Sequence, residues 1–368
     1  MKKQFELPLN GLCVILCMGL IIATLFGSDF LSGVALNIAD ECVQIRKELI
    51  TDIPVMADSS SEEKKVFSPV GFGGGYRTTS VSDTPADILE LMEKAENLYK
   101  TFEKTGDIKE EQFCTSLTGD SYGNININNR TGKNTNIKEL INTTPSYGKI
   151  TKQKPYILIY HTHTTEGYEL LDKGWYSNDY NSRTKDKNKN MVRVGEALKE
   201  AIEDCGFEVV HDKTIYDTAY TGAYDRSRKA VEKHLKENPS IVMTLDVHRD
   251  AIHYDGKVKS KPTALIDGKK AAQVMIITGC EGSGVESFED WQKNLVFSVH
   301  LQNSVEERYA GLMRPILFSY RKYNMDITPC SVLLEFGTDA NTIEEAVYSG
   351  TLIGKSIGKM LEEQLKGE

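Results

Sequence analysis

From about residue 147 onward, short apolar runs alternate with segments whose apolar residues recur at helical spacing. Apolar runs typical of buried strands lie at residues 156–160, 207–210, 241–247 and 273–278. Segments typical of amphipathic helices lie at residues 189–205, 226–237 and 291–304. A last helix–strand–helix set holds Glu335 and runs to residue 365. Strand and helix in turn predict an α/β fold with a mostly parallel sheet flanked by helices.

The amino-terminal end has a different pattern. No charged residue lies between residues 7 and 28, which is a stretch long enough to span a bilayer. Lys2 and Lys3 precede this stretch and Asp29 follows it. We therefore predict a cytoplasmic tip and transmembrane anchor at residues 1–28, with the rest of the chain outside the cell membrane. A cleaved signal peptide is the alternative.

Polar and glycine-rich segments follow the apolar stretch. They favour a partly disordered extracytoplasmic stalk over residues 29–146. Apolar residues at helical spacing predict one helix near residues 84–104, with Thr84 as its cap and Pro85 at its first position. This helix is either a solvated spacer or a docking element for a partner. The catalytic domain is expected at residues 147–368.

Composition narrows the possible functions. The chain has 368 residues, a formal net charge of −9 and seven cysteines. The acidic balance argues against a nucleic-acid partner, because no basic excess is available to neutralise phosphates. The cysteines are scattered without a Cys-x-x-Cys pair, which argues against a disulfide framework and a cysteine-rich zinc site.

Candidate chemistry gathers where strands end. His161, His163 and Glu166 directly follow the strand at residues 156–160. Ligands in α/β sheets bind just beyond the carboxyl ends of the strands. Imidazole and carboxylate together suit zinc, which takes three protein ligands in many catalytic sites. A surface loop with two solvated histidines is the alternative for this segment alone.

The same pattern returns twice downstream. His248 ends the apolar run that begins at residue 241, and Glu335 lies inside the apolar run at residues 331–336. A buried glutamate is costly unless it is paired or coordinates a cation. Neighbouring strand ends could therefore bring these side chains to one metal ion.

These residues belong to motifs that resemble the stage II sporulation protein P family. The motifs are YHTH at 160–163 with Glu166 and Tyr168, NMVRVG at 190–195, DVHRD at 246–250, YAGLMRP at 309–315 and LEFGT at 334–338. The resemblance implies a membrane-anchored peptidoglycan hydrolase that acts during engulfment of the forespore. It also implies the fold of zinc-dependent N-acetylmuramoyl-L-alanine amidases, cleavage of peptide cross-links, and stage II sporulation proteins D and M as partners.

The metal would be held by residues drawn from a set of four: His161, His163, Glu166 and His248. His161 and His163 are two positions apart and would share a face on a continuing strand, although one of them could instead support a ligand or face the substrate. Glu335 is the expected general base, which takes a proton from water and passes it to the leaving amine.

Three charged residues are candidates for a supporting role. Arg249 and Asp250 could orient His248 or bind substrate, and an ordinary surface ion pair is the alternative. Arg314 could bind a stem-peptide carboxylate, and a structural salt bridge is the alternative.

The chain departs from the broader amidase pattern at one place. Those enzymes usually supply a glutamate ligand at the start of the helix after the first strand, where this chain has Asn-Lys-Asn at 188–190 and no glutamate until Glu196. Glu166 takes the role, or the metal shell differs. The other histidines are expected to be bystanders: His211, His234, His253 and His300.

Three functions remain open from the sequence. The first is a zinc-dependent amidase that cleaves the bond between N-acetylmuramic acid and L-alanine. The second is a metallo-endopeptidase that acts only on cross-links. The third is a non-catalytic scaffold that binds the cell wall.

Overall fold

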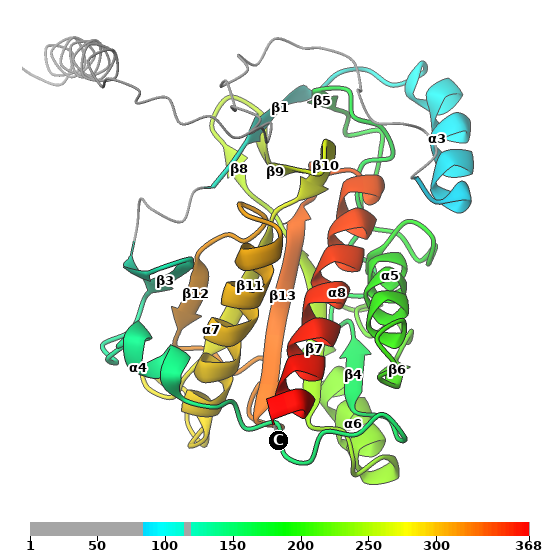
Figure 1. The fold of residues 1–368 in the computed structure, drawn as a ribbon. Coiled ribbons are helices and arrows are strands. Elements are labelled where there is room, and N and C mark those ends of the chain that lie inside the picture. The colour runs from blue at the N-terminus through cyan, green and yellow to red at the C-terminus, as the bar shows by residue number, and fades with distance from the viewer. Residues whose placement is uncertain (1–83, 114–118, 368) are drawn as a thin grey trace, which may run out of the picture. The chain divides into compact units, whose positions relative to one another are not determined.

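Two β-sheets organise the chain in the computed structural model, which describes residues 84–113 and 119–367 (Figure 1). The central sheet has eight strands, in spatial order β2 (Asp120–Tyr122), β3 (Ile125–Asn129), β12 (Ile316–Ser319), β11 (Val274–Gly279), β13 (Cys330–Thr338), β7 (Met243–Asp250), β4 (Ile157–Tyr160) and β6 (Val209–His211). Only the β2–β3 and β11–β13 pairs are antiparallel. The predicted α/β architecture is confirmed, and the sheet is mostly parallel.

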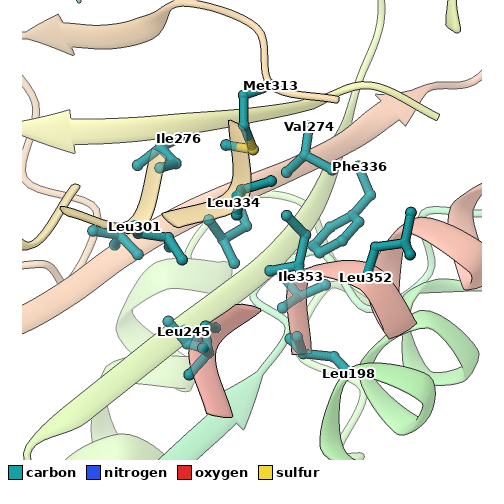
Figure 2. Close-up of a cluster of buried hydrophobic side chains, with 14 of the residues drawn as sticks. Leu198, Leu245, Val274, Ile276, Leu301, Met313, Leu334, Phe336, Leu352 and Ile353 are labelled. Carbon is teal, nitrogen blue, oxygen red and sulfur yellow. The ribbon is translucent and has the colours of Figure 1, made fainter. Parts of the chain in front are cut away.

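Three helices cover one face of this sheet: α5 (Met191–Glu203), α7 (Trp291–Arg308) and α8 (Ile343–Gly367). Figure 1 shows α7 and α8 lying across β11 and β13, with α5 beside α8. Alternate residues of the central strands pack beneath these helices. Figure 2 shows Leu334 and Phe336 in one cluster with Ile353 of α8.

The opposite face has a smaller apolar cover. Leu158 and Tyr160 pack there with Val231 of α6 (Ala223–Glu237), whereas Ile157 and Ile159 belong to the large core. This separation follows from the alternation of side chains along a strand. The same alternation turns residues 246, 248 and 335 away from the large core.

The described residues between 84 and 146, which were expected to belong to the stalk, pack in the same compact unit as residues 147–367. The helix α3 (Ala86–Tyr99) buries Ile88, and the hydroxyl of Tyr99 donates to Glu169 at 2.6 Å. Thr84 does not cap α3, because its hydroxyl donates to Glu344 in the first turn of α8. β3 and the short helix α4 (Ile137–Asn142) also precede the expected boundary at residue 147.

A second sheet was not predicted. It contains β10 (Lys269–Ala272), β9 (Val258–Ile266), β1 (Gly106–Glu111) and β5 (Trp175–Tyr176), with β8 (His253–Tyr254) paired to β9. β1 and much of β9 lack an apolar run, since lysines and acids occupy them. Lys261 of β9 is nevertheless buried, with its Nζ 2.7 Å from Glu345.

The expected helix between α7 and the strand that holds Glu335 is also wrong, because strand β12 occupies that interval. The predicted anchor at residues 7–28 lies outside the described residues. Among the helices of residues 84–113 and 119–367, none is long and apolar enough to cross a membrane.

Candidate active site

The candidate site lies on the face of the central sheet that α5, α7 and α8 leave uncovered. His248 of β7 and Glu335 of β13 are register partners on adjacent parallel strands. Both side chains are on the face opposite the large core, because their neighbours Val247 and Leu334 are core residues. The sheet therefore holds a histidine and a glutamate side by side.

A turn after β4 carries the next residues to this face. β4 ends at Tyr160, and Thr162 is fixed by Asp246: its backbone N–H donates to Oδ1 at 2.8 Å and its hydroxyl to Oδ2 at 2.7 Å. Because β4 ends at Tyr160, His161 and His163 do not share a strand face, contrary to the prediction.

His161 has both ring nitrogens engaged within the protein. Nδ1 lies 3.0 Å from the carbonyl oxygen of Val247, which only accepts, so Nδ1 carries the proton. Nε2 lies 2.8 Å from Nε2 of His211. His211 also lies 3.1 Å from Glu196 and is not a bystander, because it supports His161.

His163 lies beside His248 instead. The two ring centres are 5.3 Å apart and the rings are perpendicular, with an interplanar angle of 89°. The exposed ring of Tyr220 stacks on His163 at 4.6 Å. Burial, followed by the charge of His248, lowers the pKa of His163, so this imidazole is neutral and able to act as a ligand.

Glu166 connects these histidines to the surrounding loops. Its Oε2 lies 3.4 Å from His248 Nδ1 and accepts the backbone N–H of Arg249 at 3.2 Å. Its Oε1 accepts from Arg183 at 3.1 Å. Burial alone would raise the pKa of Glu166, but His248 and Arg249 lower it to about 2. Glu166 is therefore an anion inside the site.

His248 lies between two carboxylates. Its Nε2 is 2.8 Å from Asp246 Oδ1, although no hydrogen bond of suitable angle forms there. Burial opposes the charged form of this ring, but Asp246 and Glu166 raise the pKa of His248 well above its usual range. The surroundings thus favour a positive charge at this point, as a cation site requires.

Glu335 is partly buried, and its Oε2 atom is buried without a hydrogen-bond partner among the described residues. Burial, with the negative charges of Glu166 and Asp250, raises the pKa of Glu335 to about 8 despite the opposing influence of His248. An acid with a pKa this close to neutrality can both hold and release a proton at physiological pH.

Arg249 and Asp250 have separate roles. Nε of Arg249 donates to the carbonyl oxygen of Gly167 at 2.6 Å, which holds the loop that follows Glu166. Asp250 accepts from Arg314 at 3.0 Å. Arg314 therefore forms a salt bridge next to Glu335, with its guanidinium also 5.1 Å from the ring of Phe113.

Four further residues complete the site and were not singled out from the sequence: Asp246, Arg183, Asp217 and Tyr224. Asp246 had a detectable signal, because it lies two positions before His248 on one strand face. Arg183 and Asp217 come from polar loops without periodicity. The ring of Tyr224 lies 5.6 Å from His163 and 6.4 Å from His248, so it borders both histidines.

The donor set fits zinc in chemistry, although the shell is not preassembled. Within residues 84–113 and 119–367, no group of three or more His, Cys, Asp or Glu side chains is already arranged to hold a metal ion. Nδ1 of His163 is nevertheless buried without a hydrogen bond, and Nδ1 of His248 faces Oε2 of Glu166 at 3.4 Å. Two imidazoles on one tetrahedral zinc, with Zn–N bonds of about 2.0–2.1 Å, have ring centres roughly 5 Å apart, which agrees with the separation of these two rings.

Sequence comparison decides the family. The family model described as Stage II sporulation protein P (SpoIIP) matches residues 74–358. The chain belongs to the SpoIIP family. It is 30% identical over 207 residues to Stage II sporulation protein P of Bacillus subtilis (strain 168), which covers 53% of this chain and 48% of that protein. The SpoIIP-family chain thus spans about half the length of this relative.

Solved structures give weaker likenesses. The CwlD amidase from Clostridioides difficile, in complex with the GerS lipoprotein, matches with 15% identity and a TM-score of 0.35, covering 58% of this chain and 100% of that chain. The catalytic domain of CwlV, an N-acetylmuramoyl-L-alanine amidase from Bacillus (Paenibacillus) polymyxa var. colistinus, matches with 15% identity and a TM-score of 0.34, covering 58% and 99%.

Proposed function

We propose that this SpoIIP-family chain is a zinc-dependent peptidoglycan hydrolase of sporulation, which cleaves the amide between N-acetylmuramic acid and L-alanine. The observation that carries the proposal is the perpendicular pair of His163 and His248, whose rings lie 5.3 Å apart beside the Glu166 carboxylate. Membership of the SpoIIP family supports the biological setting.

The proposed zinc ligands are His163, Glu166 and His248. His163 is neutral, Glu166 is an anion, and the charge of His248 would be exchanged for that of the metal. His161 is left out of the shell, because Val247 and His211 occupy its two nitrogens. Zinc bound here would polarise the scissile carbonyl and acidify a water molecule.

The chain's own residues supply the proton transfer. Glu335 takes a proton from the attacking water at its free Oε2, and the protonated carboxyl then donates to the nitrogen of the leaving amine. The raised pKa of Glu335 makes its carboxylate a stronger base for the first step, and a cation bound nearby would lower that pKa and favour the ionised form. Cleavage adds one water across the amide and leaves Glu335 unchanged.

Other residues hold these groups in position. Asp246 fixes the turn that carries His163 through its two hydrogen bonds to Thr162. Arg249 fixes Glu166 through its backbone N–H and the following loop through Gly167. Tyr220 covers His163 from the solvent side.

The proposal also includes the setting of the enzyme. Residues 7–28 would anchor the chain in the cell membrane, with the catalytic part outside it. Stage II sporulation proteins D and M are the proposed partners, and cross-links are a proposed second substrate.

Digestion of purified peptidoglycan tests the reaction. The full chain in detergent would be incubated with cell wall, with and without a chelator, and the fragments identified by mass spectrometry. Free stem peptides that disappear with chelator and return with zinc are the expected result. Fragments cut only within peptide cross-links would show that the chain acts as an endopeptidase and not as an amidase. Release that is indifferent to chelator would overturn the role of zinc.

A further inference from the structure

A cavity of about 210 Å³ opens beside the candidate active site. It is lined by Thr165, Arg183, Thr184, Lys185, Asp217 and Thr218. Pockets for whole drug-sized ligands run to about 300–1,000 Å³. This cavity is smaller and therefore suits one residue of a longer substrate.

Arg183 joins the cavity to the site. Its Nη2 donates to Glu166 at 3.1 Å, while its Nη1 donates to Asp217 at 3.0 Å. A ligand in the cavity would therefore lie one side chain away from Glu166. If the scissile amide of a peptide lies at the candidate active site, the cavity would therefore hold one of the next two residues of that peptide.

The cavity favours an anion. Asp217 is its only acid among the lining residues, and its side chain is fully buried against Arg183 and Thr165. Lys185 is exposed and forms no ion pair with any described residue. Because Glu166 and Asp217 share Arg183, Lys185 supplies the free positive charge presented to a ligand, with threonine hydroxyls beside it.

The loop that carries the two cations is held in place before any ligand arrives. The backbone N–H of Thr184 donates to the carbonyl oxygen of Thr165 at 2.8 Å. The backbones of Glu166 and Arg183 also form an isolated antiparallel β-bridge. Asn190 donates to the carbonyl oxygen of Thr184 at 2.9 Å. A fixed loop loses little conformational entropy on binding.

We propose that this cavity binds a carboxylate of the stem peptide, from an acidic residue close to the scissile amide, with Lys185 as its main cationic contact. The inference rests on the proposed function, because it names how that same site recognises the peptide. A D-glutamyl residue follows L-alanine in stem peptides, and its free carboxylate has the required chemistry.

Peptide binding tests this without requiring cleavage. The full chain in detergent would be titrated by calorimetry with L-Ala-γ-D-Glu-diaminopimelate and with the same peptide carrying D-isoglutamine, whose α-carboxylate is an amide. We expect the acid to bind about tenfold more tightly, as one charge-assisted hydrogen bond predicts.

Three variants assign the preference to the cavity. Lys185→Glu should abolish it, and Lys185→Arg should retain most of it. Lys187→Glu makes the same charge change at an exposed lysine of the same loop that does not line the cavity, and it should leave the preference within about twofold of wild type. Equal unfolding temperatures would exclude a folding defect.

Equal losses in Lys185→Glu and Lys187→Glu would overturn the inference, as would a wild-type chain that binds both peptides equally or neither. If such a chain still released stem peptides from peptidoglycan, the proposed function would stand while the cavity assignment failed.

Discussion

His248 and Glu335 lie side by side on the adjacent parallel strands β7 and β13, in directly paired register positions. Strand pairing sets their separation, so the site is built on the most rigid part of the fold rather than on loops. Glu166 and His163 come from the turn after β4, which Asp246 ties to the same strand β7. Strand β7 is therefore the common support of the site.

His248→Ala should remove both bound zinc and hydrolysis, because it deletes a ligand and leaves Glu166 and Asp246 without their shared partner. Zinc per chain, measured by inductively coupled plasma mass spectrometry, checks this. His253→Ala is the control, since His253 is exposed and pairs with Asp339 outside the site. A zinc-loaded, active His248→Ala would contradict the ligand assignment.

Glu335→Gln should lower the rate of cleavage by about 10²–10⁴, the range expected for loss of a general acid–base group. Zinc content should stay at the wild-type value, because Glu335 is not a ligand in this account. Rate and zinc content would be measured on the same preparation. Loss of zinc together with activity would instead make Glu335 a ligand.

The pH dependence of stability should reveal the raised pKa of Glu335. In the metal-free chain this carboxyl has a pKa of about 8, above its ordinary 4.5, so between these pH values the folded state binds more protons than the unfolded state. The contribution of Glu335 to stability is therefore complete below pH 4.5 and lost as pH rises through about 8.

Thermal unfolding of metal-free wild type and Glu335→Gln from pH 5 to pH 9 checks this. The variant keeps a neutral side chain, so its advantage over wild type should grow as pH rises. A difference that does not change with pH would show that Glu335 ionises normally.

Mutation of His163 and mutation of His211, the partner of His161, should have different effects. His163→Ala should lose zinc. His211→Ala should keep zinc but lower the free energy of unfolding by about 1–3 kcal/mol, because it leaves Nε2 of the buried His161 without its hydrogen-bond partner. Zinc content and urea unfolding distinguish the two. Loss of zinc in His211→Ala with retention in His163→Ala would reverse the assignment.

The sequence predicted the core strands of this fold because their apolar runs are long enough to be recognised. β4, β7 and β13 each combine such a run with a polar residue at or near the end, and this pattern indicated His248 and Glu335. β1 and β9 escaped prediction, since β1 is mostly polar and Lys261 in β9 is buried through ion pairs.

The distinction between His161 and His163 could not come from the sequence. Residues two positions apart on a continuing strand would share a face. His161 and His163 do not, because β4 ends at Tyr160. The roles of Arg183 and Asp217 depend on contacts between loops far apart in sequence. Periodicity carries no signal for such contacts.

The most direct test of the central claim is the position of zinc in crystals of the zinc-loaded chain, measured by anomalous diffraction at the zinc absorption edge. We expect one strong peak bounded by His163, Glu166 and His248, with Glu335 nearby. A peak between His161, His211 and Glu196, or no peak on the face that carries Glu335, would contradict it.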